Sequence, residues 1–306
     1  DCSNAVTLAF LEAFALTPVA DPHCFLRWHS KLDPEVWNRA MKMLSQGRSM
    51  PMLINDHVAV PGLENSGIAT NDAWNYCVVG CNEVGIPGRC CQSGFSLGLG
   101  FVDIHLLHKV LDEESADYDS CDAILEAYAE KVYDSTVRGI SQRKKRTEGL
   151  ANLVPFPFCS ACCHGSIEKG KDYLLAMPYP DIYGLFIRGT TNAVNALAAI
   201  DDIVFNKREM SLARYLERLD SEDPAIIARI QHVQRWGQDN DMVDRWAEKL
   251  SVTRQDAVNR AAKDAGVPLP VICHVVRSLH HLDGRNFKAS ADGRQACTPL
   301  CDSIGA

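Results

Sequence analysis

The sequence predicts an α/β fold. Short apolar segments typical of strands alternate with longer segments whose apolar residues recur at helical spacing, and glycine or proline separates many of them. Of the 306 residues, 46% are hydrophobic and 23% are charged, which is typical of a globular protein with a sizeable core. Strands that alternate with helices indicate a sheet covered by helices, and the pattern allows a barrel.

The first elements follow from local signals. We expect a helix over residues 6–16, because its apolar run stops at Thr17-Pro18. Residues 23–30 are short and rich in aromatic side chains, which predicts a strand. A second helix is predicted over residues 34–44, with Asp33 as its cap and proline in its first turn.

The next stretch combines short apolar runs with a glycine-rich segment. The pattern predicts a strand at residues 51–54, a helix or turn at 57–65, and a short helix that starts at residue 71. Residues 76–79 are apolar and lead into GCNEVGIPG, residues 80–88. Three glycines and a proline in nine residues predict a loop there.

The remaining chain is predicted to be mainly helical, with a second loop after the proline pair at 155–157. Helices are expected at residues 101–111, 120–146, 193–205, 212–219, 241–250 and 254–265.

Composition limits the class of protein. The net charge of −8 argues against nucleic acid or an anionic membrane as a main partner, and the sequence has no apolar run long enough to span a bilayer. The first residues lack the basic segment and cleavage site of a signal peptide, so we expect a core helix there. The thirteen cysteines are scattered and odd in number, which favours reduced thiols in a cytoplasm over a disulfide scaffold.

The stretch that carries chemistry is Val79-Gly80-Cys81-Asn82-Glu83. An apolar run leads into a loop in which a cysteine follows a glycine, and a carboxylate follows the cysteine two residues later. Residues i and i+2 can face the same side of an extended or tightly turned segment, so the pair could share one pocket. Such a pair suits a nucleophile or radical with an acid/base partner. By spacing alone, a buried structural cysteine beside a surface glutamate is the favoured interpretation.

The wider context resembles the glycyl radical enzyme family, a pyruvate formate-lyase-like superfamily. Residues 53–88 are similar to the family's cysteine-loop region, with Asn55-Asp56, then a segment that ends in Asp72-Ala73, then the Val-Gly-Cys-x-Glu loop. Four further segments resemble family motifs in the same order: residues 156–173, 198–219, 235–247 and 289–306.

The resemblance implies a fold and an assembly. The fold would be part of a ten-stranded α/β barrel made of two antiparallel half-barrels, with helices outside and a central cysteine loop. Residues 1–306 would be a partial barrel domain that lacks the N-terminal part and the C-terminal glycyl radical domain. The implied partners are a small-molecule substrate, a radical S-adenosylmethionine activating enzyme, the missing glycine-loop segment or subunit, and, as an option, a second copy in a homodimer.

The resemblance also implies a mechanism. A glycyl radical from the missing segment would take hydrogen from Cys81, whose thiyl radical would then take hydrogen from the substrate, with Glu83 as acid/base partner. We expect no bound cofactor in this chain and no turnover without the glycine loop. Because Gly80 precedes Cys81 and Cys77 is four residues away, acyl transfer by a cysteine pair is disfavoured. A dehydratase or decarboxylase type of lyase is favoured, and cleavage of C–O, C–N, C–S and C–C bonds stays open.

Substrate contacts are expected from three further residues. The resemblance implies that Arg27 and His29 end a strand that points into the barrel, where they could bind an anionic group or form a structural ion pair. His164 follows Cys162-Cys163, but adjacent ligands fit poorly around one tetrahedral zinc ion, so no metal site is expected.

Two other classes of function compete with the lyase. A truncated relative could act as an inactive scaffold or binding subunit, which the missing glycine loop favours and retention of Cys81 and Glu83 disfavours. A zinc-dependent or cysteine-nucleophile hydrolase would need a ligand set or a histidine partner that the sequence does not offer.

Overall fold

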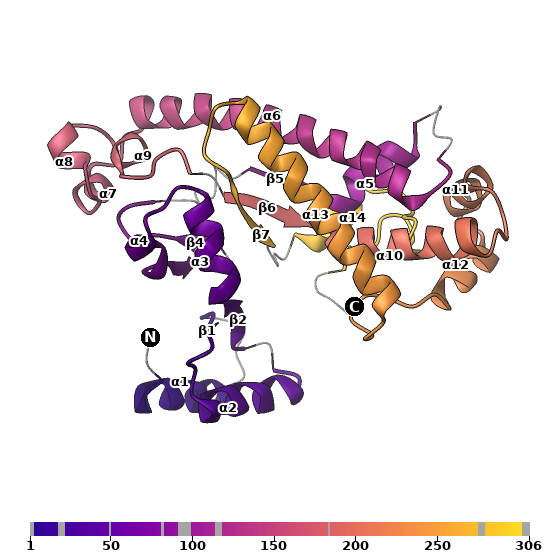
Figure 1. Cartoon of the computed structure of the whole chain (residues 1–306), viewed down its shortest axis with the longest axis horizontal. Helices are drawn as coiled ribbons and strands as arrows, with labels where there is room; N and C mark the ends of the chain where they lie inside the picture. Colours follow the sequence, from indigo (N-terminus) through magenta and orange to yellow (C-terminus); the bar gives the residue numbers. More distant parts are fainter. Residues whose placement is uncertain are drawn as a thin grey trace.

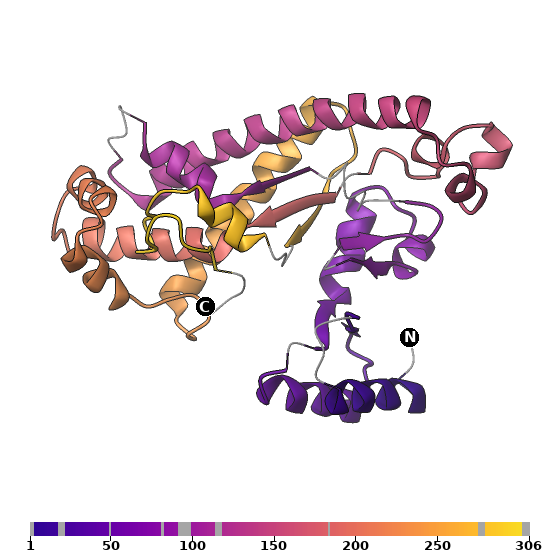
Figure 2. The same cartoon turned by 180° about the vertical axis from the view of Figure 1, so that it is seen from behind.

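The computed structural model shows a mixed α/β chain that is mostly helical (Figures 1 and 2). It describes residues 3–17, 22–48, 50–80, 83–90, 99–113, 118–182, 184–274 and 279–301. Within these ranges the strands form three separate sheets. The sheets are open and have two or three strands, so the expected ten-stranded barrel is not confirmed by the described residues.

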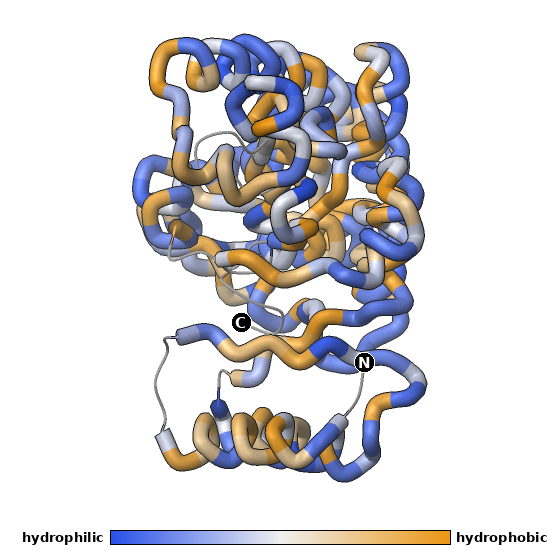
Figure 3. The backbone as a smooth tube through the Cα atoms, turned by 90° about the vertical axis from the view of Figure 1, so that its left-hand side faces the viewer, coloured by the Kyte–Doolittle hydropathy of each residue, from blue (hydrophilic) through white to orange (hydrophobic). Residues whose placement is uncertain are grey.

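The N-terminal elements are two helices and two parallel strands. They are α1 (Ala5–Leu16), β1 (Phe25–Trp28), α2 (Pro34–Ser45) and β2 (Met52–Asn55). The side chain of Asp33 accepts a hydrogen bond from the Glu35 N–H, which confirms the predicted cap of α2. The two helices lie side by side at the base of the molecule, and hydrophobic residues run along this layer (Figure 3).

The predicted glycine-rich loop is largely a β-hairpin. Its strands are β3 (Cys77–Val79) and β4 (Glu83–Gly85), which pair antiparallel. Helices α3 (Asp56–Asn65) and α4 (Thr70–Trp74) precede it. The expectation of a loop from residue 80 onward was therefore wrong at β4, because cross-strand pairing with β3 overrides the local glycine signal. Buried apolar side chains of α3, α4 and the hairpin share one core.

A three-stranded parallel sheet lies at the centre of the remaining chain, in the order β5-β6-β7. Its strands are β5 (Leu99–Val102), β6 (Gly184–Arg188) and β7 (Val271–His274). Each crossover between them is helical, as parallel strands require. The sequence patterns did not reveal these strands, and β5 occupies the start of the segment predicted as a helix from residue 101.

Helices fill both crossovers. Between β5 and β6 lie α5 (Asp103–Leu111), α6 (Cys121–Leu153), α7 (Pro157–Ala161), α8 (Ser166–Lys169) and α9 (Tyr173–Ala176). Between β6 and β7 lie α10 (Thr190–Ile200), the π-helical turn η1 (Asp201–Asn206), α11 (Leu212–Asp220), α12 (Pro224–Gln231) and α13 (Asp241–Asp264). The two helices predicted at 241–250 and 254–265 are one continuous helix, α13. It packs against α6 over the sheet (Figure 1).

A buried ionic cluster joins this helical layer to the sheet. Asp103, at the end of β5, is fully buried and accepts hydrogen bonds from Tyr128 of α6 and Thr190 of α10, each at 2.7 Å. Arg254 of α13 completes the cluster at 2.5 Å from the same carboxylate. One residue therefore ties three helices to the carboxyl end of the sheet.

The last described segment is α14 (His280–Arg285) followed by a compact turn. Asp292 accepts hydrogen bonds from Ser290 and from Asn192 of α10, each at 2.6 Å. The Arg294 guanidinium donates to the carbonyl oxygens of Thr298 and Lys288. In the part of the chain that the structure describes, no helix combines the length and apolarity needed to cross a membrane.

Candidate functional site

The hairpin β3–β4 places Glu83. Its register pairs Val79 with Glu83, so Gly80, Cys81 and Asn82 join the two strands. Gly80 adopts a φ of 66°, a left-handed conformation that glycine takes without steric cost. Cys81 and Asn82 lie outside the described residues, so the predicted contact between the Cys81 thiol and Glu83 stays a prediction.

The side chain of Glu83 is buried next to Gly80. Only 1% of the residue is exposed. A Cβ atom built on Gly80 would lie 3.0 Å from its Oε2 and 3.4 Å from its Oε1, so the carboxylate lies against the backbone of the residue before Cys81. A buried carboxylate next to this loop is the arrangement that an acid/base group shielded from water requires.

A second thiol packs against the hairpin. Cys273 of β7 is buried and shares a core with Val84 and Ile86. Burial raises the pKa of Cys273 to about 11; a hydrogen bond from the Val84 backbone opposes the rise, and the charge of Glu83 adds to it. Cys273 is therefore a protonated thiol at neutral pH, and it lies close enough to Glu83 for the carboxylate charge to raise its pKa.

Two side chains from residues 23–28, which we call the β1 segment, contact the hairpin or the residues just before it. The Nδ1 atom of His23 lies 3.2 Å from the Gly80 carbonyl oxygen. The Nη1 atom of Arg27 donates to the carbonyl oxygens of Trp74 and Tyr76, at 3.2 and 3.3 Å. Arg27 thus holds the chain just before β3, and His23 contacts the residue just after it.

Arg27 is held by a buried carboxylate. Its Nε and Nη2 donate to the two oxygens of Asp56 at 2.9 and 3.0 Å, and the Tyr76 hydroxyl donates to the same carboxylate at 2.5 Å. The guanidinium also lies 4.0 Å from the Tyr76 ring centroid. Burial, and then the hydrogen bond to Asp56, raises the pKa of Tyr76 well above its usual range. This geometry is the structural ion pair that the sequence left as an alternative to substrate binding.

The other two predicted substrate contacts lie apart from this network. The His29 Nδ1 accepts a hydrogen bond from the Lys31 N–H at 3.1 Å, within its own turn. His164 is exposed, and its backbone N–H donates to the Gly88 carbonyl at 2.9 Å, which links the α7–α8 loop to the end of the hairpin segment. Roles for Arg27, His29 and His164 in substrate binding stay predictions.

Metal binding is not indicated around His164. Cys159 and Cys162 are exposed, and the short helix α7, which contains Cys159 and ends just before Cys162, has no buried residue. Among the described residues, no group of three His, Cys, Asp or Glu side chains is arranged to hold a metal ion.

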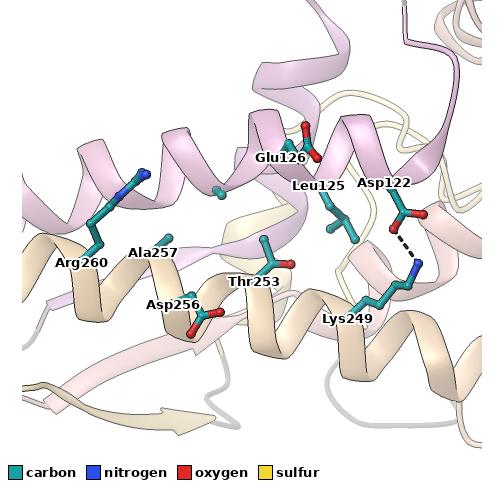
Figure 4. Close-up of a pocket in the computed structure, with 9 residues that line it drawn as sticks. Asp122, Leu125, Glu126, Lys249, Thr253, Asp256, Ala257 and Arg260 are labelled. Atoms are coloured by element: carbon teal, nitrogen blue, oxygen red, sulfur yellow. Dashed lines mark hydrogen bonds and ion pairs between the residues drawn. The ribbon is translucent and has the colours of Figure 1, made fainter.

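Two surface grooves lie away from Glu83. One of about 420 Å³ lies between α6 and α13 and is crossed by an ion pair of 2.6 Å between Asp122 and Lys249 (Figure 4). The other, of about 600 Å³, lies between α1 and β1; it is lined mainly by apolar side chains, with His23 at one edge. Neither groove includes Glu83 or Cys273 among its lining residues.

Sequence reasoning missed His23 and Cys273. His23 begins the segment predicted as a strand, but no pattern marks it as a partner of a loop 57 residues later. Cys273 was one of thirteen cysteines without a motif. Both come to the hairpin through long-range packing, which local spacing does not encode.

Comparison with known proteins identifies relatives along the whole chain. The family described as PFL-like, pyruvate formate lyase-like, matches residues 1–276. The (2S)-3-sulfopropanediol dehydratase of Klebsiella oxytoca is 23% identical over 326 residues, covering 100% of this chain and 39% of the relative. The isethionate sulfite-lyase of Desulfovibrio desulfuricans is 23% identical over 333 residues, covering 100% of this chain and 39% of that protein.

Solved structures share the fold. The glycerol-bound B12-independent glycerol dehydratase of Clostridium butyricum superimposes with a TM-score of 0.79 at 22% identity, over 99% of this chain and 40% of that one. A glycyl radical enzyme from Archaeoglobus fulgidus gives a TM-score of 0.79 at 19% identity, over 98% of this chain and 40% of that chain. This chain thus spans about two fifths of the length of these proteins.

Proposed function

The chain belongs to the pyruvate formate lyase-like family, and from this premise we propose that it forms the cysteine-loop part of a glycyl radical lyase. Cys81 is the hydrogen-transferring thiol and Glu83 is the acid/base group. The observation that supports this proposal is the buried Glu83 carboxylate, which lies against the backbone of Gly80, the residue bonded to Cys81.

The chemistry at Cys81 is hydrogen-atom transfer. In the assembled protein, the glycyl radical removes the hydrogen atom from the Cys81 thiol. The sulfur then takes a hydrogen atom from the substrate carbon and returns one to the product at the end of the cycle. Because S–H bonds and activated C–H bonds are similar in strength, each transfer is reversible and depends chiefly on holding the atoms at near-attack distance, roughly 3–3.5 Å.

The task of Glu83 is proton transfer. A carboxylate beside the substrate radical accepts the proton of an adjacent hydroxyl group, which promotes loss of the neighbouring substituent, and it can later return that proton. Its burial keeps water from competing for the proton. Glycine at position 80 leaves no second thiol adjacent to Cys81, which argues for elimination over acyl transfer.

The substrate class follows from the relatives by analogy. Their names describe loss of water from a sulfopropanediol or a hydroxyproline and release of sulfite from isethionate. We propose a small hydroxylated substrate that loses a neighbouring group, with C–O or C–S cleavage ahead of decarboxylation. The radical would be installed by a radical S-adenosylmethionine activating enzyme.

Anaerobic electron paramagnetic resonance tests this function. The sample contains this chain with a glycine-loop polypeptide, the activating enzyme and a panel of diols, hydroxysulfonates and hydroxyprolines, with Cys81→Ala as the control variant. We expect a glycyl doublet in both proteins and substrate consumption only with Cys81 present. Equal consumption by Cys81→Ala would contradict the assignment. A doublet without any turnover would favour the alternative of an inactive scaffold or binding subunit.

A further inference from the structure

The β1 segment contacts the hairpin at the carbonyl next to Cys81. His23 and Gly80 are 57 residues apart, yet the ring nitrogen Nδ1 lies 3.2 Å from the Gly80 oxygen. A carbonyl oxygen only accepts hydrogen bonds, so Nδ1 must carry the proton and act as the donor. The ring is also packed edge-on against Phe25, with centroids 6.0 Å apart and an interplanar angle of 84°.

The Gly80 carbonyl controls the orientation of the following residue. A peptide unit is planar, so the direction of a carbonyl oxygen fixes the plane of the peptide that leads to the next residue. Glycine at φ 66° imposes little steric preference of its own, and a hydrogen bond to its oxygen selects one orientation of that plane. The Glu83 carboxylate also lies against Gly80.

A second contact anchors the same segment. Arg27, four residues after His23, holds the carbonyl oxygens of Trp74 and Tyr76 ahead of β3 and is itself fixed by Asp56. The entrance of β3 is thereby tied to β1. His23 donates at the other end of β3, to Gly80. Gly80 has no side chain that could hold its own backbone in place.

We infer that His23 is a positioning residue, which orients the peptide between Gly80 and Cys81 and so sets the position of the thiol for hydrogen transfer. This inference rests on the proposed function of Cys81. A misplacement of about 1 Å can reduce the rate of an oriented reaction by about a hundredfold, so loss of the donor should slow hydrogen transfer without preventing formation of the glycyl radical.

Deuterium exchange into the glycyl radical measures this transfer without any substrate. In D₂O the thiol proton of Cys81 is replaced by deuterium. Reversible hydrogen transfer between Cys81 and the radical glycine then places deuterium on the glycine Cα, and the glycyl doublet collapses to a narrower line. No oxidant or reductant is consumed, because each transfer breaks one S–D or C–H bond and forms another. The rate of collapse in the assembled, activated protein is the readout.

Two variants separate the donor from the ring. His23→Phe keeps a ring but removes the donor, and His23→Asn removes most of the ring but keeps an N–H donor near the position of Nδ1. We expect at least tenfold slower collapse in His23→Phe and a rate within threefold of the unmodified protein in His23→Asn. Radical content and melting temperature should be unchanged in both. His232→Ala is the matched control, because its Nδ1 also contacts a carbonyl oxygen, that of Ala228 at 2.8 Å, but on α12.

The outcomes distinguish two failures. Collapse that depends on Cys81 but is unaffected by His23→Phe would overturn the role of His23 alone. Equal slowing in both variants would show that ring shape matters and the donor does not, which also overturns it. A doublet that never collapses in the unmodified protein, together with no Cys81-dependent substrate consumption, would mean that Cys81 does not exchange hydrogen with the glycine, and the proposed function would fail together with the inference.

Discussion

The carboxylate of Glu83 lies so close to Gly80 that an added Cβ atom would be 3.0 Å from its Oε2. Gly80→Ala should therefore be costly in two ways. Alanine at a φ of 66° is strained by about 1–2 kcal/mol, and its methyl group pushes a buried carboxylate away from the cysteine loop. We expect a lower free energy of unfolding in urea and at least tenfold slower turnover.

Gly266→Ala separates strain from steric contact. Gly266 has a φ of 64° and no heavy atom within 4 Å of an added Cβ, so its substitution carries the same strain without touching Glu83. The two variants should lose similar stability, while only Gly80→Ala loses activity. Equal activities would mean that the contact between Gly80 and Glu83 has no role in turnover.

Glu83→Gln should uncouple hydrogen transfer from proton transfer. The amide fills the same buried space but cannot accept and return a proton, and loss of a general acid/base group typically lowers turnover by 10²–10⁴-fold. Deuterium exchange into the glycyl radical depends on Cys81 and should continue at the normal rate. Turnover of Glu83→Gln within threefold of the unmodified protein would exclude Glu83 as the acid/base group.

Local signals in the sequence predicted the elements that local physics determines. Asp33 caps α2 through a hydrogen bond to a nearby backbone N–H, and this contact involves residues close in the chain. The long apolar periodicity of α6 likewise predicted a helix, although the helix continues to Leu153, beyond the predicted end at residue 146.

The central sheet, and the contacts of His23 and Cys273 with the hairpin, could not be predicted from local signals. The strand β6 (Gly184–Arg188) is a short apolar run buried on both faces, and such a run cannot be told from a piece of buried helix by periodicity. Its identity depends on pairing with β5 and β7, whose partner residues lie 86 positions before and 87 positions after it in the sequence. His23 and Cys273 reach the hairpin through the same kind of long-range packing.

The hydroxyl of Tyr76 should contribute to the stability of the segment that precedes the cysteine loop. Tyr76→Phe removes its 2.5 Å hydrogen bond to Asp56 but keeps the ring under the Arg27 guanidinium. A hydrogen bond to a buried charged group is worth about 1.5–3 kcal/mol, and we expect a loss of this size in urea unfolding.

Tyr133→Phe is the matched control for Tyr76. Tyr133 also donates to an aspartate, Asp264 at 2.8 Å, and also lies under an arginine, Arg260, but this hydrogen bond is exposed to solvent. Water can replace its hydrogen bond, so the loss should be less than about 1 kcal/mol. Similar losses in the two variants would show that burial does not strengthen the Tyr76 contact.

The ion pair between Arg254 and Asp103 should be essential for folding of the helical layer. Arg254→Met leaves the Asp103 charge fully buried without its cation, which typically costs 3–5 kcal/mol. Adding Asp103→Asn should restore part of the stability, because it removes the uncompensated charge. Arg260→Met, on the same helix and visible in Figure 4, breaks a surface pair with Glu130 and a stacking contact with the Tyr133 ring, and should cost no more than about 2 kcal/mol. Urea unfolding of the three variants and the unmodified protein would measure these differences.

The thiol of Cys273 should be unreactive in the folded protein despite its place beside the hairpin. With a pKa of about 11, only about one thiol in a thousand is ionised at pH 8, and the thiolate is the form that alkylating reagents attack. Anaerobic labelling with iodoacetamide, followed by peptide mass spectrometry, should modify exposed Cys162 quickly and Cys273 only after unfolding in guanidinium. Labelling of folded Cys273 should rise roughly tenfold per pH unit below pH 11. Rapid labelling at pH 8 would mean that the thiol is ionised and open to solvent, contrary to the buried packing of β7 against the hairpin.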